Sequence, residues 1–359
     1  MKRRRFSFRK FALFIIVLII LVFVCFLGLY KFETSAVSGK TKAITVEVEK
    51  GDNYFTMAKK LKEKNLIKSE FFYRIFLKLH KPGKLVVGNY DLNRAMSVAE
   101  IVETLGNENN VIKTRITLTF REGLNVRQMA KIIAEKTDIT EDEFFNKIND
   151  EAYVDSLKDK YWFITDDVKN PQIYYDLEGY LFPDTYVFEA QQLNLDNILT
   201  SMLNNTDKKI ANLKNSIEKS GYSVHEIFTL ASLVELESVT DDDRAMVAGV
   251  FYNRLNNNWS LGSDVTTYYA SKKAMTEALT KAELDACNGY NTRCASMKGL
   301  PVGPIANPSL SALKAAINPT DSDYYYFVAD SEKKVYFTKN ANEHAKIIAE
   351  LKKAGKWIG

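Results

Sequence analysis

The strongest bias in the pattern of apolar and charged positions lies at the N-terminus. The first ten residues carry six basic side chains and no acidic one, and residues 11–30 then contain no charged side chain. A run of this length can cross the roughly 30 Å hydrocarbon core of a bilayer as one helix, and the positive-inside rule places its basic end in the cytoplasm. The pattern predicts a single-pass membrane protein with a cytoplasmic tail at residues 1–10, a transmembrane helix at 11–30 and the rest of the chain outside. A cleaved signal peptide is the competing interpretation, but the run is longer than a usual signal core and no Ala-x-Ala site follows it.

After a linker at residues 31–43, an alternation of apolar and polar positions occurs twice, at an offset of 72 residues. The matching segments are 44–51 with 116–123, Met57-Ala58-Lys59 with Met129-Ala130-Lys131, and Phe72 with Phe144. In each copy the alternation gives way to a 3.6-residue period, which predicts a strand, a glycine turn and two helices. Such βαα units resemble LysM-type modules, which bind the sugar backbone of cell-wall polymers; a spacer domain is the alternative. We expect the first unit in a module at residues 44–110 and the second at about 116–148.

The remainder, residues 111–359, mixes strand patterns with several helical ones. The aromatic runs at 324–329 and 334–337 are typical of strands, and the mixture predicts an α+β domain rather than a regular βαβ repeat. The sequence contains no phosphate-binding loop, dinucleotide fingerprint or Gly-x-Ser-x-Gly elbow, so nucleotide chemistry and serine-based hydrolysis have no support. The expected fold class is α+β: an N-terminal transmembrane helix, a small LysM-like βαα module and a larger mixed α+β domain.

The helical pattern at residues 223–237 places an acidic residue among apolar ones. Ser223 and Glu226 have the spacing of a capping box, so we expect a helix to begin there. The residues four, seven and eight positions before Glu235 are Ala231, Phe228 and Ile227. Glu235 therefore lies on the apolar stripe, where desolvation disfavours a charged carboxyl and leaves it able to donate a proton. A buried Glu paired with Arg or Lys is the alternative. Glu237 is about 200° further round the helix, so we expect it to be solvated or salt-bridged and not to share this task.

Charge and cysteine content narrow the function classes. The net charge of +4 includes the six basic residues of the tail, so the rest of the chain is mildly acidic, which argues against a nucleic-acid ligand. The histidines His80, His225 and His344 are far apart, which argues against a zinc site. Cys287 and Cys294 flank six residues in a compartment where disulfides form, and both a bridge and two free thiols remain open.

Four segments of the back half are polar, aromatic and rich in turn residues. They are Glu-Gly-Tyr-Leu-Phe-Pro-Asp-Thr-Tyr at 178–186, Leu-Ala-Ser-Leu-Val-Glu at 230–235, Leu-Gly-Ser-Asp-Val-Thr at 261–266, and Tyr-Asn-Thr at 290–292 with Gly-Leu-Pro-Val-Gly-Pro-Ile-Ala-Asn-Pro at 299–308. Sugar-binding grooves use such surfaces, because aromatic faces pack on pyranose rings and polar groups satisfy hydroxyls. Together, in this order and behind an apolar N-terminal segment, the motifs closely resemble the endolytic murein transglycosylases, the YceG-like family. The resemblance covers nearly the whole chain.

The resemblance implies a peptidoglycan lytic transglycosylase, a carbon–oxygen lyase. Such an enzyme cuts the MurNAc–GlcNAc β-1,4 bond within nascent strands, leaves a 1,6-anhydroMurNAc end and so terminates strand elongation. Glu235 falls on the family's catalytic Glu, and no metal or organic cofactor is implied. Glu178, Asp264, Tyr290 and Asn291 are candidates for holding the sugars, with structural capping of turns as the alternative for each. The implied partners are peptidoglycan strands and membrane-bound synthases, the penicillin-binding proteins of the elongation or division machinery.

The sequence departs from the family pattern in two places. The family usually has Gln or a similar polar residue where Gly262 stands and Pro where Val265 stands, whereas Asp264 and Thr266 are kept. A substrate contact at position 262 is therefore unsupported, although the fold is not in question. The stretch 287–298 is also longer and carries both cysteines, which reshapes one wall of the expected groove.

Two rival functions remain at the level of sequence. One is a non-catalytic peptidoglycan-binding scaffold of the cell-wall synthesis machinery, which would not need an acid on an apolar helix face. The other is a muramidase that uses water, with Glu178 or Asp264 as the second carboxylate, because hydrolysis generally needs two. Hydrolysis leaves reducing ends and transglycosylation leaves anhydro ends, so the products separate these two reactions.

Overall fold

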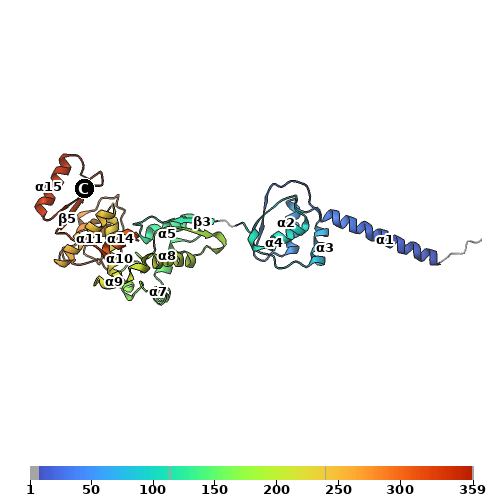
Figure 1. Ribbon diagram of the computed structural model, residues 1–359, viewed down its shortest axis with the longest axis horizontal. Helices are drawn as coiled ribbons and strands as arrows, with labels where there is room; N and C mark the ends of the chain where they lie inside the picture. The colour runs from blue at the N-terminus through green and yellow to red at the C-terminus, as the bar shows by residue number, and fades with distance from the viewer. Residues whose placement is uncertain (1–7, 113–114, 239, 358–359) are drawn as a thin grey trace, which may run out of the picture. The chain divides into compact units, whose positions relative to one another are not determined.

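The chain is a mixed α+β protein that falls into two units (Figure 1). The computed structural model describes residues 8–112, 115–238 and 240–357. The first unit comprises residues 1–114 with 189–191, and the second comprises 115–188 with 192–359. The apolar helix and the small module belong to the first unit, and the four motifs belong to the second.

The N-terminal helix α1, Phe8–Glu33, contains the predicted span. Its segment Phe11–Glu33 is long and apolar enough to cross a membrane, and none of its most apolar stretch is buried within the protein. A membrane anchor and a signal sequence both have this length and composition. The basic residues 1–7 of the predicted tail lie outside the described residues.

The first unit contains the strand and two helices that the sequence predicts, followed by a second strand and another helix. Its elements after α1 are β1 Ile44–Val48, α2 Tyr54–Glu63, α3 Glu70–His80, β2 Gly88–Leu92, α4 Val98–Leu105 and the short η1 Glu108–Asn110. β1 and β2 pair in antiparallel register, with Val46 opposite Tyr90. Both of these side chains are fully buried. The second strand satisfies one edge of β1 and adds Tyr90 and Leu92 to the core of the unit.

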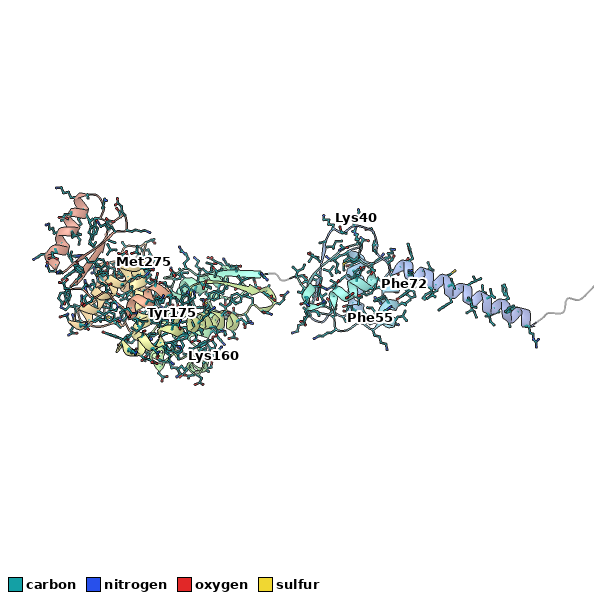
Figure 2. The ribbon with its side chains drawn as sticks, viewed as in Figure 1. Lys40, Phe55, Phe72, Lys160, Tyr175 and Met275 are labelled. Carbon is teal, nitrogen blue, oxygen red and sulfur yellow. A yellow bond between two sulfur atoms is a disulfide. The ribbon has the colours of Figure 1, made fainter. Side chains whose placement is uncertain are left out.

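The end of α1 packs against α3 of the same unit. The Phe72 ring lies 6.0 Å from that of Phe26 and 6.4 Å from that of Tyr30 (Figure 2). Lys68 donates to the carbonyl of Phe32 at 2.9 Å, and its ammonium group lies 3.9 Å from the centre of the Phe32 ring. The module is therefore seated directly on the end of the apolar helix.

These contacts correct one detail of the predicted repeat. The N-caps of the two helices are Asn53 and Ser69 in the first copy and Asn125 and Thr140 in the second. The caps of the first helix, Asn53 and Asn125, are 72 residues apart, whereas those of the second helix, Ser69 and Thr140, are 71 apart. The distance from one cap to the next is therefore one residue shorter in the second copy. The buried counterpart of Phe144 is therefore Tyr73. The predicted counterpart, Phe72, faces α1 instead.

The second unit is mostly helical, with four short strands that form two pairs. Its strands are β3 Arg115–Thr119, β4 Thr185–Glu189, β5 Tyr326–Ala329 and β6 Val335–Thr338. Its α-helices are α5 Val126–Lys136, α6 Glu141–Ile148, α7 Glu151–Lys158, α8 Leu195–Ile210, α9 Lys214–Lys219, α10 Val224–Glu237, α11 Asp241–Asn256, α12 Asp264–Ala270, α13 Lys281–Asp285, α14 Leu310–Ile317 and α15 Ala341–Lys353. Its 3₁₀ turns are η2 Asp166–Lys169 and η4 Ala211–Leu213, and the turn η3 Ala190–Gln192 begins in the residues that belong to the first unit. β3 pairs with β4, and β5 with β6. β3, α5 and α6 form the second predicted βαα unit, whose strand takes its partner from far along the chain.

Helix α10 runs through the middle of the second unit, against α11, α12 and α14. Every residue from Val224 to Glu235 is buried except Glu226. The sequence predicted that α10 is buried along one apolar stripe. Neighbouring helices instead enclose it on several sides. Glu235 lies in its last turn, where the helix emerges from the core.

The two cysteines of the second unit form a disulfide. Cys287 and Cys294 are bridged, with 5.2 Å between their Cα atoms. We expect loss of the bridge, in a Cys287→Ser/Cys294→Ser variant, to lower the free energy of unfolding of this unit by up to ~2–3 kcal/mol, because a short closed loop in the unfolded chain is released. Urea unfolding followed by tryptophan fluorescence checks this value. Equal stability of the bridged and bridge-free proteins would contradict it.

Candidate active site

The position of Glu235 follows from how α10 begins. Ser223 accepts a hydrogen bond from the backbone N–H of Glu226 at 3.1 Å, and the Glu226 carboxylate accepts one from the backbone N–H of Ser223 at 2.7 Å. This is the predicted capping box, which fixes the start of the helix and with it the phase of every residue that follows. At the far end, Glu235 is only 9% exposed.

Three donors hold the Glu235 carboxyl group. Arg244 donates from Nη2 to Oε1 at 3.2 Å, and Ser309 donates to Oε2 from its backbone N–H at 3.0 Å and from Oγ at 2.5 Å. The alternative interpretation of the sequence, a buried Glu paired with an Arg, therefore describes the contacts of Glu235. The pairing does not close the site, because Glu235 also lines a cavity. Charge-assisted bonds to both oxygens leave the carboxyl with one fixed orientation.

Both partners of Glu235 come from helix starts. Arg244 lies in the first turn of α11, which Thr240 and Asp243 cap reciprocally, and it also pairs with Asp241 at 2.7 Å. Ser309 is the N-cap of α14, where its hydroxyl accepts from the Ala312 N–H at 3.1 Å. The Gly/Pro-rich motif at 299–308 leads directly into this cap. Two helix N-termini thus supply the groups that orient one carboxyl.

The cavity beside Glu235 has a volume of about 500 Å³ and carries charged and aromatic groups. Its lining includes Glu122, Arg127, Tyr268, Tyr269 and Lys273. Polar, charged and aromatic groups around one concave surface suit a carbohydrate. Among the residues that the structure describes, no group of three or more His, Cys, Asp or Glu side chains could hold a metal ion.

Glu122 is a second acid at the mouth of this cavity. Burial, and then the charge of Glu235, raise the pKa of Glu122. The neighbouring Gly123 has a φ of +76°, and a Cβ there would lie 3.2 Å from Leu236 and 3.6 Å from the Cγ of Glu235. Glycine at this position therefore lets the β3–α5 turn approach the end of α10 closely. Sequence reasoning did not select Glu122.

Glu178, a predicted substrate-binding residue, is 1% exposed and does not line the cavity. Its carboxyl accepts from the Val126 N–H at 3.1 Å, from the Tyr269 hydroxyl at 3.0 Å and from Asn307 Nδ2 at 3.2 Å. Burial raises its pKa to about 8, against the opposing effect of these donors. The residue joins the first turn of α5, α12 and the Gly/Pro-rich motif beneath the cavity. Its surroundings support the structural alternative.

Tyr290 and Asn291 are also buried, at 1% and 0% exposure. The Tyr290 hydroxyl accepts from the Tyr174 N–H at 3.2 Å, and its ring lies 4.8 Å from the Tyr269 ring. Asn291 Nδ2 donates to three backbone carbonyls at the end of α13, those of Glu283, Leu284 and Ala286. Both residues hold the loop before the Gly/Pro-rich motif, which again supports capping and packing roles.

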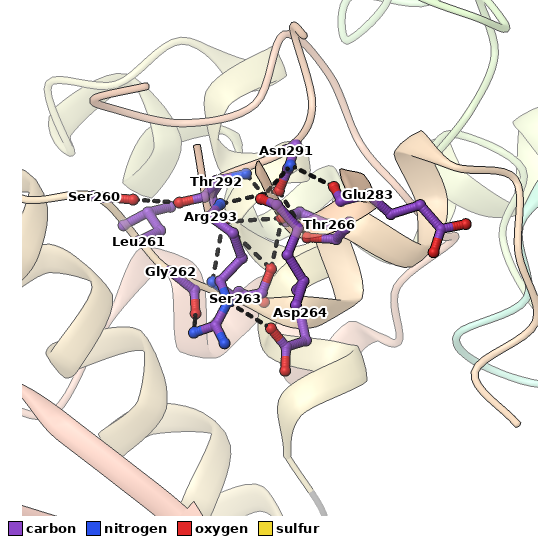
Figure 3. A network of polar contacts seen from close by, with 12 residues as sticks. Ser260, Leu261, Gly262, Ser263, Asp264, Thr266, Glu283, Asn291, Thr292 and Arg293 are labelled. Atoms are coloured by element: carbon purple, nitrogen blue, oxygen red, sulfur yellow. Dashed lines mark hydrogen bonds and ion pairs between the residues drawn. The ribbon is translucent and has the colours of Figure 1, made fainter. Parts of the chain in front are cut away.

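Asp264 lies at the first position of α12 and lines a different cavity from Glu235. Its side chain is half exposed and pairs with Arg293 at 2.7 Å (Figure 3). Gly262, where the family usually has Gln, has a φ of +59° and donates from its N–H to the carbonyl of Thr292 at 3.1 Å. Glycine here serves a turn that the disulfide-bridged loop holds in place.

The environment of Glu237 differs from the prediction of a solvated or salt-bridged acid. Its side chain is largely enclosed and accepts a hydrogen bond from the Ser263 hydroxyl at 2.5 Å. Burial raises the pKa of Glu237. The helix phase was right in separating it from Glu235, since the two acids line separate cavities. The prediction of a solvated or salt-bridged environment was wrong because the 259–265 loop folds back over the end of α10.

Sequence reasoning missed Glu122, Arg244 and Ser309. Glu122 occupies the repeat position at which the first copy has Lys50. This change from a basic to an acidic side chain at equivalent positions was a signal that could have singled out Glu122. Arg244 lies nine residues and Ser309 74 residues after Glu235. Their approach depends on how α11 and α14 pack on α10, which no local pattern encodes.

Comparison with known proteins gives consistent matches over most of the chain. Residues 46–350 match the YceG-like family. The chain is 35% identical over 304 residues to an endolytic murein transglycosylase of Bacillus subtilis, covering 84% of this chain and 83% of that protein. It is 32% identical over 325 residues to an endolytic murein transglycosylase of Streptococcus pneumoniae, of whose length it spans 58%. The crystal structure of a YceG-like protein from Listeria monocytogenes matches with a TM-score of 0.61 at 33% identity, over 86% of this chain and 100% of that one.

Proposed function

This chain belongs to the YceG-like family, and from that premise we propose that it is a membrane-anchored endolytic transglycosylase of peptidoglycan. The observation that carries the proposal is the buried Glu235 carboxyl, which three donors orient toward an open polar cavity. A scaffold that only binds glycan has no use for such an oriented acid. Lytic transglycosylases act on peptidoglycan as lyases, and their reaction suits one oriented carboxyl group.

In the proposed reaction Glu235 acts twice. As a general acid it protonates the glycosidic oxygen, and the bond between that oxygen and C1 of the MurNAc unit breaks. As a carboxylate it then accepts the proton of the 6-hydroxyl of the same unit, whose oxygen attacks C1 and closes the 1,6-anhydro ring. The proton lost in the first step is regained in the second, so no water is consumed.

Arg244 is proposed as a positioning residue for Glu235. We expect Arg244→Ala to lower the kcat of strand cleavage roughly 10- to 100-fold with little change in KM, because a small misplacement of a catalytic group is costly. Arg244→Lys should retain part of the rate, since a lysine keeps the charge but not the planar fork. Initial rates over a range of peptidoglycan concentrations check both values.

The surface variant Arg74→Ala is the matched control, because Arg74 pairs with Glu70 at 3.4 Å in the first unit. Its kcat should equal that of the parent. An unchanged kcat in Arg244→Ala would remove Arg244 from the mechanism.

Hydrolysis is the second candidate reaction, and Glu122 is the observation that favours it. Glu178 is buried and Asp264 lines another cavity, so neither predicted partner can serve as the second carboxylate. Glu122 lines the cavity with Glu235 and interacts with its charge. A carboxylate in this position could activate a water molecule on the opposite side of the sugar.

Mass spectrometry of the released glycan fragments separates the two reactions. Anhydro ends support transglycosylation by Glu235 alone, and reducing ends support hydrolysis with Glu122. The purified full chain in detergent, acting on isolated peptidoglycan, is the appropriate enzyme. Absence of any cleavage, with intact binding of strands, would favour the scaffold.

We further propose that α1 is a retained anchor with its basic end in the cytoplasm, and that the second unit acts outside the cell on strands leaving a membrane-bound synthase. The length and apolar character of α1 and the six basic residues before its apolar span support this orientation. The first unit would bind glycan in the manner of LysM modules. Its two strands with two helices between them support this, as does a shallow cavity of about 400 Å³ lined by Tyr54, Phe76 and His80.

The anchor proposal predicts a split between activity in solution and function in the cell. A protein that begins at Thr41 should cleave isolated peptidoglycan about as fast as the full chain, because α1 packs on α3 within the first unit and lines no part of the Glu235 cavity. When exported untethered it should complement a deletion strain poorly, since tethering supplies effective concentration. Full complementation would show that membrane tethering is not needed for function in the cell. It would not affect the proposed role of Glu235.

A further inference from the structure

A second cavity, of about 630 Å³, lies beyond Val265 from the Glu235 cavity. Val265 lines both cavities, and the last turn of α10 contributes Glu235 to one and Glu237 to the other. The walls of the second cavity come from the end of α11, the 259–265 loop, Arg293 and β5. A strand bound at Glu235 could therefore extend into a neighbouring concave surface in the same unit.

The second cavity has an aromatic platform that is held in place. Trp259 is 41% exposed. Its ring lies 4.9 Å from the tilted ring of Tyr325, and 6.1 Å from the ring of Tyr326, which it meets edge-on. The backbone N–H of Trp259 donates to the carbonyl of Arg254 at 2.8 Å. A large aromatic side chain that is exposed, but braced from behind, is suited to pack on a sugar ring.

The charges around this platform favour an anion. Asp264 neutralises Arg293, but the Arg254 guanidinium donates to the carbonyls of Tyr325 and Leu261 and makes no ion pair within the described part of the chain. Lys298 is an exposed cation at the rim. Glu237 is a second acid of this cavity and interacts with Arg254 and Arg293, and burial disfavours its charged form.

From this geometry we infer that the second cavity is an accessory binding site for a carboxylate-bearing unit of the glycan strand, which stacks on Trp259 and pairs with Lys298 and Arg254. The inference rests on the proposed function for the identity of the strand. Two carboxylates fit the same chemistry, namely the lactyl group of a MurNAc unit without peptide and a carboxylate of an attached peptide. An uncharged glycan would use the aromatic platform alone.

Calorimetric titration of the full chain in detergent tests the inference. The Glu235→Gln background prevents turnover, and the probes are a GlcNAc–MurNAc tetrasaccharide with free lactyl groups, the same tetrasaccharide with attached peptides, and uncharged chitotetraose. We expect Trp259→Ala to weaken binding of all three probes roughly tenfold and Trp259→Phe to restore most of the loss. Lys298→Glu should weaken binding of the acidic probes roughly threefold or more and leave chitotetraose unchanged.

Lys346→Glu is the matched control, because Lys346 is an exposed lysine of the same unit that lines neither cavity. A Lys298→Glu effect confined to the probe with free lactyl groups assigns the lactyl carboxylate, and an effect confined to the peptide-bearing probe assigns a peptide carboxylate. An effect on both shows that the site accepts either carboxylate. Parent-like binding by Trp259→Ala and Lys298→Glu would overturn the inference, as would an equal loss for chitotetraose in Lys298→Glu. Cleavage by Glu235→Gln is assayed separately, so failure of the proposed chemistry is distinguishable from failure of this site.

Discussion

Glu235→Gln is expected to lower strand cleavage by roughly 10²–10⁴-fold, the range that general acid–base catalysis usually contributes. Glutamine keeps the shape of the side chain but cannot donate and recover the proton of a carboxylic acid. The fold should survive, because the amide oxygen can still accept from Ser309 and because Arg244 keeps its pairing with Asp241 at 2.7 Å. The measurement is the initial rate of fragment release from isolated peptidoglycan by the full chain in detergent.

Glu226→Gln is the control for this result, since it makes the same chemical change on the same helix. Glu226 is exposed and belongs to the capping box, in which Gln also serves. Its rate should match that of the parent. A Glu235→Gln enzyme that turns over like the parent would end the assignment, and an equal loss in Glu226→Gln would show that the change acts through the helix rather than through the chemistry.

The features that the sequence predicted well depend on local signals. The start of α10 follows from Ser223 and Glu226, which contact each other over three residues. The apolar run that forms α1 needs no partner to be recognised, and the repeat revealed the strand and two helices of each unit. Cys287 and Cys294 are close in sequence, so a bridge was a natural alternative, although nothing in the spacing distinguished it from two free thiols.

The features that the sequence did not predict depend on contacts between distant segments. β2 completes the sheet of the first unit by pairing with β1, and its short, mixed pattern of polar and apolar residues carries little signal by itself. Glu178 belongs to a polar, turn-rich motif that is typical of a groove. Its carboxyl instead satisfies the Val126 N–H at the start of α5 and the side chain of Asn307. A turn-rich motif can serve the inside of a fold as well as its surface when it has buried donors to satisfy.

The two copies of the repeat show how one local fold acquires a site. Both contain a strand, a glycine turn and a helix with an asparagine N-cap. In the first copy the turn carries Lys50, and in the second it carries Glu122 beside the end of α10. The difference lies in what packs against the turn. Gly123 approaches Glu235 closely, whereas within the described residues a Cβ on Gly51 would meet nothing within 4 Å beyond its neighbours in the chain. The turn itself is therefore permissive, and tertiary contact makes it part of the site.

The stability of the second unit should fall as the pH rises from about 4.5 to about 8, because the pKa of Glu178 in the folded protein is raised to about 8 by burial. Between its ordinary value and this raised value, the folded chain holds a proton that the unfolded chain releases. Folding is then favoured below that window and loses up to about 1.4 kcal/mol per pH unit within it. Urea unfolding followed by tryptophan fluorescence reports on this unit alone, since all three tryptophans, Trp162, Trp259 and Trp357, lie in it.

Glu178→Gln should remove this part of the pH dependence, because an amide does not titrate. It should also lower stability at pH 5, since the amide nitrogen brings two hydrogens among groups that donate, those of Val126, Tyr269 and Asn307, whereas the protonated carboxyl brings one. Glu218→Gln, at an exposed position of the same unit, should keep the slope of the parent. If the parent and Glu178→Gln lose stability equally between pH 5 and pH 8, Glu178 is ionised in the folded protein throughout that range. Its hydrogen-bond donors would then outweigh its burial.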